Sequence, residues 1–586
     1  MTKNFSSILV ANRGEIAVRI LRTCRDDGYR TIAVYSETDA DALHVQLADE
    51  ALALPGRTAV ETYLNQEAVI EAALVAGAEA VHPGYGFLSE NADFAAAVEA
   101  AGLTWIGPSP AAIETLGDKV TARDIARRVG APLVTGTPGP VEDASEVEAF
   151  VAEHGLPIAI KAAYGGGGRG MRVVREAGHV ADAFEAARRE ATTAFGRGEC
   201  FVEVYLDQPR HVEAQVLADD YGNVVVVGTR DCTIQRRHQK LIEEAPAPFL
   251  TDEQRRIIHD ASKAICREAA YAGAGTVEFL IDTAGRISFL EVNTRLQVEH
   301  PVTEETTGID LVSEQLAIAR GERLRLAADP QPVGHAIEFR INCEDPAAGF
   351  IPSPGVISTW DLPTGPGIRV DSGVTKGWEI NGLFDSMVAK LIVSGPSRAS
   401  ALARSRRALR DLRIAGVPTV LELDAMIIEH PAFAAPEGTY AAATDWLEQH
   451  LDELLPPTDA DLDGTTVQVR LGRRTLQVAL PGMASLTTES ANKVRDQSAQ
   501  LTVPEATVQG NDVVAPMQGT IVRVSIANGD LVKVGDPIAV LEAMKMENPV
   551  LAHREGEIVG LNVAVGETRG QGDLICQISD PEGEGS

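Results

Sequence analysis

The sequence lacks the features of a secreted, membrane-spanning or nucleic-acid-binding protein. Its six cysteines are scattered among 586 residues without a C-x-x-C pair or a zinc-like histidine spacing, which argues against a disulfide framework and a zinc site. No run of about 18 apolar residues occurs, and the apolar run near the N-terminus is too short for a signal peptide. The net charge of −32 would repel nucleic acid. We therefore expect a soluble, cytoplasmic protein with reduced thiols, bound to neither membrane nor nucleic acid.

The length and a hydrophobic content of 45 % predict a multidomain globular protein. Short apolar runs at 8–10, 31–35 and 78–81 alternate with helical spacing, as at Ala17, Ile20, Leu21 and Cys24. Strands alternating with helices predict a parallel α/β sheet in about the first hundred residues. The following segment, to about Trp446, mixes helices with antiparallel hairpins.

The composition changes after Trp446. Pro456 and Pro457 interrupt the pattern, and two period-2 runs, 467–471 and 476–480, predict a small hairpin. Residues from about 485 to 511 are polar and aperiodic, which is typical of a flexible tether. A tether of thirty residues would span roughly 30 Å.

A repeat with a period of 37 residues fills the last segment. Gly519, Gly529 and Gly535 recur as Gly556, Gly566 and Gly572, with matching neighbours at each position. Two equivalent halves predict a flattened β-barrel. The segment Glu542-Ala543-Met544-Lys545-Met546-Glu547 lies between the halves, on a hairpin that would project Lys545 into solvent.

An exposed lysine is usually only a solvated charge, but the neighbours of Lys545 indicate more. Ala-Met-Lys-Met on a hairpin of a repeated β-domain closely resembles the biotinyl carrier domain, whose lysine is acylated by biotin. Lipoyl domains share the repeat but usually carry Asp-Lys-Ala. The resemblance therefore implies covalent biotin on Lys545.

Two lysines and a glycine run predict a phosphate-binding site. Lys119 precedes a helix, and Lys161 ends an apolar strand shortly before Gly165, Gly166, Gly167 and Gly168. Glycines let backbone N–H groups approach phosphate, and lysines add positive charge. A glycine run alone would also suit a flexible loop, so this prediction depends on its context.

Two glutamates predict a metal site. The midpoint between Glu278 and Glu291 falls at the centre of the turn 282–286, so a symmetric hairpin would place the carboxylates opposite each other, about 5 Å apart. A divalent cation would relieve their repulsion, and oxygen ligands near phosphate favour Mg²⁺ or Mn²⁺. The alternative is a pair of glutamates on a solvated sheet face. An extended chain beyond Glu291 would also aim Asn293, Arg295, Gln297 and Glu299 the same way.

Long motifs between Ile8 and about Trp446 resemble the biotin carboxylase family of ATP-grasp enzymes. They are Ala11-Asn12-Arg13-Gly14-Glu15-Ile16-Ala17, the segment from His82 to Asn91, Gln235-Arg236-Arg237-His238-Gln239-Lys240, and the segment from Glu291 to His300.

Val420 and the segment 60–63 depart from the family pattern without touching the expected chemistry. His82 and Tyr85 suit a structural turn as well as substrate contact, and Arg236 to His238 would also suit an ordinary basic patch.

The resemblance implies a role for each matching position. Lys119, Lys161, Glu203, His211, Gln235 and His238 would contact ATP, and Glu278, Glu291 and Asn293 would hold the metal ions. Lys240, Arg295, Gln297 and Val298 would seat bicarbonate, with Glu299 as the base. Arg340 would face the biotin ureido oxygen. The glycine-rich segment would close as a lid over ATP.

The expected fold is a multidomain α/β protein. The implied domains are a Rossmann-like domain (1–115), an ATP-grasp domain (116–330) with a mobile lid (about 133–203), a biotin carboxylase C-terminal domain (331–446), a hairpin module (447–484), a linker (485–511) and an all-β biotinyl domain (512–581).

Nothing in the chain resembles a carboxyltransferase, so we expect a separate carboxyltransferase β subunit to accept the carboxyl group. The organisation resembles the α subunits of acetyl- and propionyl-CoA carboxylases of actinobacterial type. It implies a biotin protein ligase as a further partner and a homo-oligomer inside a larger hetero-oligomer. The acceptor stays open, since 3-methylcrotonyl-CoA, urea and pyruvate are alternatives. A non-catalytic carrier or scaffold is the alternative from another class.

Overall fold

The computed structural model describes residues 4–163, 171–195, 197–435, 440–455, 466–471, 474–479, 511–515, 519–543, 546–570 and 572–579. The chain forms two compact units, one from residues 1–346 and 351–454, the other from residues 347–350 and 455–586. Within the parts of the chain described, no helix is both long and apolar enough to cross a membrane.

The first unit begins with the predicted parallel sheet, whose strand order is β3-β2-β1-β4-β5. Ile8, Leu9 and Val10 are fully buried in its central strand. The elements are β1 (Ser7–Val10), α1 (Gly14–Asp26), β2 (Arg30–Tyr35), α2 (Leu43–Leu47), β3 (Glu50–Ala53), α3 (Gln66–Val75), β4 (Ala80–His82), α4 (Ala92–Ala100), β5 (Thr104–Trp105) and α5 (Pro110–Gly117).

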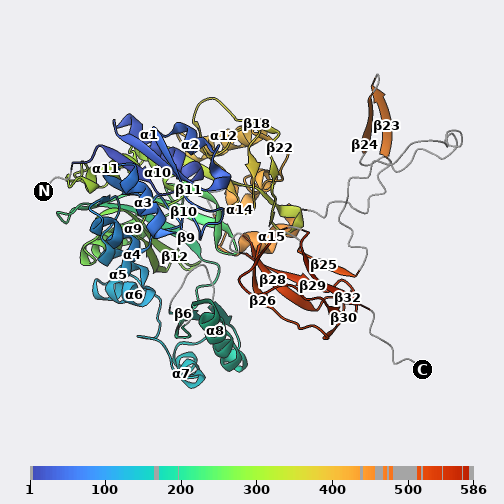
Figure 1. Cartoon of the computed structure of the whole chain (residues 1–586). Helices are drawn as coiled ribbons and strands as arrows, with labels where there is room; N and C mark the ends of the chain where they lie inside the picture. The colour runs from blue at the N-terminus through green and yellow to red at the C-terminus, as the bar shows by residue number, and fades with distance from the viewer. Residues whose placement is uncertain are drawn as a thin grey trace, which may run out of the picture. The chain divides into compact units, whose positions relative to one another are not determined.

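An antiparallel sheet of eight strands, in the order β13-β12-β9-β10-β11-β14-β21-β19, forms the largest layer of the first unit (Figure 1). Its strands are β9 (Arg210–Ala218), β10 (Val224–Arg236), β11 (Gln239–Ala245), β12 (Gly273–Ile281), β13 (Ile287–Asn293), β14 (His335–Asn342), β19 (Ile368–Ser372) and β21 (Met387–Gly395). Because β11 pairs with β14, the sheet runs across the expected domain boundary at 330/331 without interruption.

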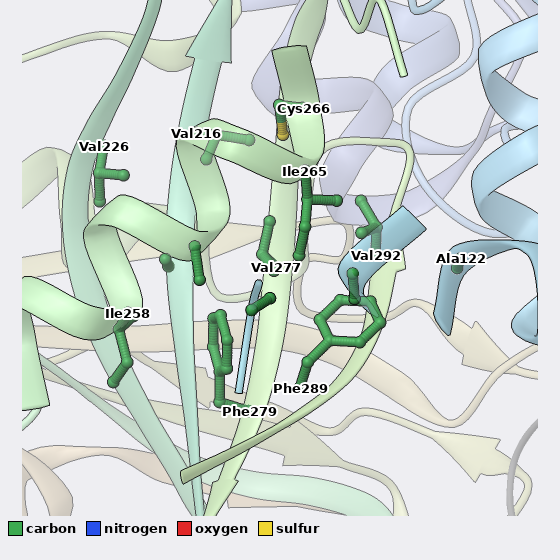
Figure 2. Close-up of a cluster of buried hydrophobic side chains, with 14 of the residues drawn as sticks. Ala122, Val216, Val226, Ile258, Ile265, Cys266, Val277, Phe279, Phe289 and Val292 are labelled. Atoms are coloured by element: carbon green, nitrogen blue, oxygen red, sulfur yellow. The ribbon is translucent and has the colours of Figure 1, made fainter. Parts of the chain in front are cut away.

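Helices α6 (Lys119–Arg128) and α9 (Asp252–Glu268) cover one face of this sheet through a shared apolar core. Figure 2 shows Ile258 and Ile265 of α9 lying against Val277 and Phe279 of β12, with Phe289 and Val292 of β13 beside them. The Phe279 and Phe289 rings meet edge to face, with centroids 6.2 Å apart. This packing fixes the β12–β13 hairpin, which carries several of the predicted site residues.

A smaller body, close to the range of 133–203 expected for the lid, has a core of its own. The sheet β7-β6-β8 consists of β6 (Ile158–Ala162), β7 (Met171–Val174) and β8 (Cys200–Val204), and it packs with α7 (Ala144–His154) and α8 (Val180–Phe195). Val147, Ile160, Phe184 and Val202 are among its buried residues. A separate core allows such a body to move as one piece.

The remaining helices of the first unit are α10 (His300–Thr307), α11 (Leu311–Ala319), α12 (Arg398–Asp411), α13 (Leu421–Ile427), α14 (Pro431–Ala434) and α15 (Trp446–Leu454). Its short strands are β15 (Glu344–Asp345), β16 (Ile351–Pro352), β17 (Gly355–Val356), β18 (Thr359–Asp361), β20 (Glu379–Ile380) and β22 (Arg413–Ala415). They pair as β15-β16, β17-β20 and β18-β22.

In the second unit the predicted hairpin is present as β23 (Thr466–Leu471) and β24 (Arg474–Ala479), with Val467 opposite Val478. The carrier segment contains β25 (Asp512–Val514), β26 (Gly519–Val524), β27 (Leu531–Val532), β28 (Pro537–Ala543), β29 (Met546–Leu551), β30 (Gly556–Val559), β31 (Thr568–Arg569) and β32 (Leu574–Ser579).

The 37-residue repeat of the sequence is a structural repeat. It relates the sheet β25-β32-β30-β27 to the sheet β29-β28-β26-β31, strand for strand. Equivalent turn glycines share their backbone conformation, with φ 92° at Gly529 and 93° at Gly566. This left-handed conformation favours glycine. The predicted arrangement of two equivalent β-halves is confirmed.

Candidate active site

The predicted metal pair lies as expected. Glu278 on β12 is directly opposite Glu291 on β13, and the pairing depends on an irregularity that the sequence did not predict. Close to the turn, Phe279 pairs with Phe289, so an unbroken ladder would place Leu290 opposite Glu278. The register shift makes Leu290 an extra residue, a β-bulge, and brings Glu291 into line.

The expectation of an extended chain from Glu291 to Glu299 is wrong beyond Asn293. Strand β13 ends there, and Glu299 is already the N-cap of α10. The side chains converge nevertheless. Arg295 donates to the Asn293 side-chain oxygen at 3.0 Å and to that of Gln297 at 2.7 Å. The Gln297 amide donates to Glu278 at 3.1 Å.

Lys240, on β11, lies at the centre of the site. Its ammonium donates to Glu213 and Glu299 at 2.6 Å each and to Glu278 at 3.1 Å. Burial lowers the pKa of Lys240, but the surrounding carboxylates outweigh burial and hold it well above its usual value. Lys240 is therefore a permanent cation at this position.

Glu299 is fully buried between two cations. One carboxylate oxygen accepts from Lys240, and the other accepts from Arg340 at 3.0 Å. Burial raises its pKa, but Lys240, Arg340 and Arg230 reverse the effect, so the pKa of Glu299 lies well below its usual range. The Cys232 thiol is 3.8 Å from the same carboxylate. Glu299 is thus an ionised, desolvated carboxylate.

Arg340 reaches this site from β14, through the pairing of β11 with β14. Its guanidinium bridges Glu299 and the buried Glu243 of β11, the latter at 2.5 Å. Burial raises the pKa of Glu243 to about 7. On β21 the fully buried Lys390 lies opposite Arg340 and donates to the Val298 carbonyl at 2.8 Å. This bond fixes the orientation of the peptide between Val298 and Glu299.

The residues expected to hold metal fit a hard cation. Glu278 accepts from His211 at 2.8 Å and from the Asn293 amide at 2.7 Å, while Glu291 forms an ion pair with Lys119 at 3.0 Å. Two opposed carboxylates beside an amide oxygen form the oxygen-donor set that Mg²⁺ prefers. Lys119, Lys240 and His211 balance the charge of these carboxylates here, so a divalent cation would take over part of these contacts when it binds.

On the expected nucleotide side, Glu203 of β8 is buried and paired with Lys161 and with Arg123, the latter at 2.6 Å. Their charges overcome burial and lower the pKa of Glu203. Gln235 lies near the end of β10, and His238 lies in the turn between β10 and β11. Gly165, Gly166, Gly167 and Gly168 lie outside the described residues, as does Lys545, although Ala543 and Met546 on either side of it pair as expected of a hairpin.

The sequence interpretation missed Glu213, Arg230 and Glu243. Glu213 accepts from Arg230 at 2.5 Å as well as from Lys240, and both Glu213 and Arg230 are fully buried. Arg230 also donates to Thr276 on β12 and to Thr303 on α10, at 3.0 and 2.9 Å. A signal for Glu213 existed, because it lies two residues after His211 and so faces the same side of its strand.

Family models match most of the chain. They are "Biotin carboxylase, N-terminal domain" at 4–113, "Carbamoyl-phosphate synthase L chain, ATP binding domain" at 118–327, "Biotin carboxylase C-terminal domain" at 338–449 and "Biotin-requiring enzyme" at 511–578. The first three cover the unit that holds the clustered charges, and the fourth covers the repeat.

Among relatives, the biotin-dependent acyl-coenzyme A carboxylase alpha3 subunit of Mycobacterium leprae is 55 % identical over 93 % of this chain and 94 % of its own. The biotin carboxylase of Nostoc sp. is 50 % identical over 73 % of this chain and 96 % of its own.

A solved structure of the biotin carboxylase domain of Hydrogenobacter thermophilus 2-oxoglutarate carboxylase, bound to MgADP, ADP and bicarbonate, covers 77 % of this chain and 99 % of its own. Its TM-score is 0.73 at 45 % identity.

These matches agree with the fold and with the charged site. The protein is an ATP-dependent ligase that carboxylates biotin with bicarbonate, using Mg²⁺, and it works with a carboxyltransferase partner. The chain belongs to the family of biotin-dependent acyl-coenzyme A carboxylase α subunits, and it joins a biotin carboxylase of ATP-grasp fold to a biotinyl carrier domain.

Proposed function

We propose that Glu299 is the base that deprotonates bicarbonate and that Lys240, Arg295, Gln297 and Val298 hold the anion beside it. The observation that carries this role is the burial of an ionised Glu299 between Lys240 and Arg340. An arriving anion would offset part of this positive charge. The proton affinity of Glu299 would then rise when the substrate is in place.

Bicarbonate is a poor electrophile without a leaving group, so it must be activated. Its proton passes to Glu299, the freed oxygen attacks the γ-phosphorus of ATP, and the bond to ADP breaks to give carboxyphosphate. We assign Lys119, Lys161, His211, Gln235 and His238 to ATP, with Glu203 positioned by its ion pairs. Lysine charge near the transferring phosphate stabilises the transition state.

Arg340 is assigned to the ureido oxygen of biotin. Its guanidinium donates to Glu243 and Glu299 and is 15 % exposed, so it remains accessible from the site. The ureido nitrogen takes the carboxyl group of carboxyphosphate, whose C–O bond breaks to release phosphate, and the departing phosphate accepts the ureido proton. A cation at the ureido oxygen stabilises the negative charge that develops there. The smaller body close to 133–203, with its separate core, is proposed as the lid that keeps carboxyphosphate from water.

Glu278, Glu291 and Asn293 are the residues that would hold Mg²⁺, which neutralises phosphate charge when bound. We predict that Glu291→Gln raises the Mg²⁺ concentration for half-maximal ATP hydrolysis about tenfold or more, because one anionic ligand is lost. Titration of Mg²⁺ at saturating ATP measures it. Glu253→Gln, an exposed glutamate on α9, is the control. An unchanged Mg²⁺ dependence would show that Glu291 is not a metal ligand.

We propose acetyl-CoA or propionyl-CoA as the final acceptor, after transfer by a carboxyltransferase β subunit. Support comes from the relative named as an acyl-coenzyme A carboxylase subunit, which matches this chain over 93 % of its length. Urea, pyruvate and 3-methylcrotonyl-CoA remain the alternatives.

A biotin protein ligase would load Lys545, and the catalytic unit would form a homo-oligomer. The six unpaired, buried cysteines support a reducing cytoplasm.

The β23–β24 hairpin is our proposed contact with the carboxyltransferase. Purification of the tagged chain from its native cell, followed by assay against a panel of acyl-CoAs, tests acceptor and partner together. We expect deletion of residues 466–479 to abolish co-purification of the carboxyltransferase while ATP hydrolysis with free biotin is retained. Co-purification by the deleted chain would refute the hairpin contact. Activity confined to pyruvate or urea would refute the acceptor.

We retain the domain division given above as a proposal. The matched ranges 4–113, 118–327, 338–449 and 511–578 support its outer boundaries. The shared eight-stranded sheet adds that the second and third domains fold against each other.

A further inference from the structure

The turn between β10 and β11 has an unfavourable backbone for its sequence. Gln235 pairs with Lys240 and Arg236 with Gln239, which leaves Arg237 and His238 as a two-residue connection. Both have positive φ angles, 46° and 64°. Two successive positive φ angles are those of a type I′ turn, which favours Asn-Gly or Gly-Gly because side chains with a Cβ clash there.

The position of the turn suggests why larger side chains stand here. His238 is one of its two central residues, and Gln235 and Lys240 lie directly before and after it on the paired strands. Glycines would form the turn without strain but would supply no side chain at 238. Strained backbone of this kind persists only where the surrounding structure holds it in place.

A helix that is distant in sequence stabilises this turn. The Glu448 carboxylate accepts a hydrogen bond from the Arg237 backbone N–H at 2.6 Å, across 211 residues of sequence. Glu448 lies on α15, whose Trp446 and Leu447 are buried. The Trp446 ring packs on His430 at 4.9 Å between centroids. The acceptor is therefore carried by an anchored helix.

The charge of Glu448 acts on the same turn. Burial lowers the pKa of His238, and the neighbouring Glu448 opposes that change. The Glu448 carboxylate thus accepts the hydrogen bond of the Arg237 backbone N–H, and its negative charge favours the protonated form of His238.

We infer that Glu448 is a positioning residue for nucleotide binding: it holds the Arg237–His238 turn in its strained form and so presents His238 beside Gln235 and Lys240. The inference rests on the proposed assignment of His238 and Gln235 to ATP. The residue that stabilises the turn thus belongs to α15, whose last residue, Leu454, is also the last residue of the first unit.

The full-length biotinylated chain with Glu448→Ala tests the inference. We expect the KM for ATP to rise about tenfold, since losing a charge-assisted bond lowers the population of the competent turn. The kcat should change less than about twofold, because the bound nucleotide restores the turn. Glu448→Gln keeps an acceptor oxygen and should stay within about threefold of the parent chain.

Arg237→Gly provides a rescue, since glycine adopts the positive φ without a clash. Added to Glu448→Ala, it should return the KM for ATP to within about threefold of the parent chain. Glu453→Ala is the matched control, because Glu453 lies on the same helix, is 65 % exposed and contacts His430 at 3.6 Å. It should leave the KM unchanged.

Hydrogen exchange of the backbone amides at 235–240, measured without nucleotide, separates this inference from the proposed function. Faster exchange in Glu448→Ala than in Glu453→Ala supports the hold on the turn even if ATP proved not to bind beside His238. The inference is overturned if Glu448→Ala matches the control in both exchange and KM. It is also overturned if Arg237→Gly fails to rescue the KM of a Glu448→Ala chain that melts normally.

Discussion

Glutamine in place of Glu299 is expected to slow bicarbonate-dependent ATP cleavage by a factor of about 10²–10⁴, the usual contribution of a general base. The carboxylate is fully buried and touches Lys240 and Arg340, so glutamine keeps the size and the hydrogen-bonding oxygen but loses the basicity. The loss should appear in kcat, since the neighbouring anion-binding groups remain. Initial rates of ADP release with free biotin and varied bicarbonate measure it.

Glu305→Gln is the matched control for this prediction. It lies on α10, which begins directly after Glu299, and its nearest cation is Arg369 at 3.4 Å. The control should retain the rate of the parent chain. A Glu299→Gln chain that melts normally and cleaves ATP at a rate within about threefold of the control would remove Glu299 from the role of base.

The pKa of Glu299 also predicts a pH dependence. Without substrate it lies well below the usual value, because the charges of Lys240, Arg340 and Arg230 outweigh the effect of burial. The base therefore stays ionised as pH falls from neutrality to the usual glutamate pKa of about 4.3. A fall of kcat/KM for bicarbonate in that interval is therefore expected to come from other titrating groups, including protonation of bicarbonate itself, and a pH–rate profile corrected for the bicarbonate concentration should show no titration of Glu299.

Arginine in place of Lys545 is expected to abolish biotin attachment and acyl-CoA carboxylation completely. Only a primary amine forms the amide to biotin, and arginine keeps the charge without offering one. Hydrolysis of ATP with free biotin should continue at the rate of the parent chain, because Lys240, Glu299 and Arg340 lie in the first unit and Lys545 lies in the second. Streptavidin blotting, paired with the ATP assay, measures both halves of the prediction.

Lys533→Arg is the control for Lys545→Arg. Lys533 is an exposed lysine of the same domain, in the turn that follows β27. Biotin should attach normally to that variant. Streptavidin binding by Lys545→Arg would show that another residue carries the biotin.

Local patterns predicted much of the fold. The glycines of the 37-residue repeat predicted two equivalent β-halves, because turns that require a positive φ favour glycine at fixed positions of the sequence. The alternating strands and helices predicted the parallel sheet around Ile8 to Val10. The opposition of Glu278 and Glu291 was also predicted, although its cause is the bulge at Leu290 rather than a symmetric hairpin.

Long-range pairing accounts for most of what the sequence could not predict. Arg340 reaches Glu299 because β11 pairs with β14 nearly a hundred residues later, and no local period encodes that neighbour. The buried partners Arg230 and Glu243 became visible only with the strands in place. The extended-chain prediction was wrong beyond Asn293 because His300 and Pro301 begin a helix, and proline is favoured at that position.

This chain is expected to carboxylate the biotin on its own Lys545. The most direct test is incubation of the full-length, biotinylated chain with ATP, Mg²⁺ and ¹⁴C-bicarbonate in the absence of any other protein. We predict acid-labile label on the chain, stoichiometric with biotin, that requires ATP and is absent from Lys545→Arg and from Glu299→Gln. A fully biotinylated chain that acquires no ATP-dependent label would contradict the account.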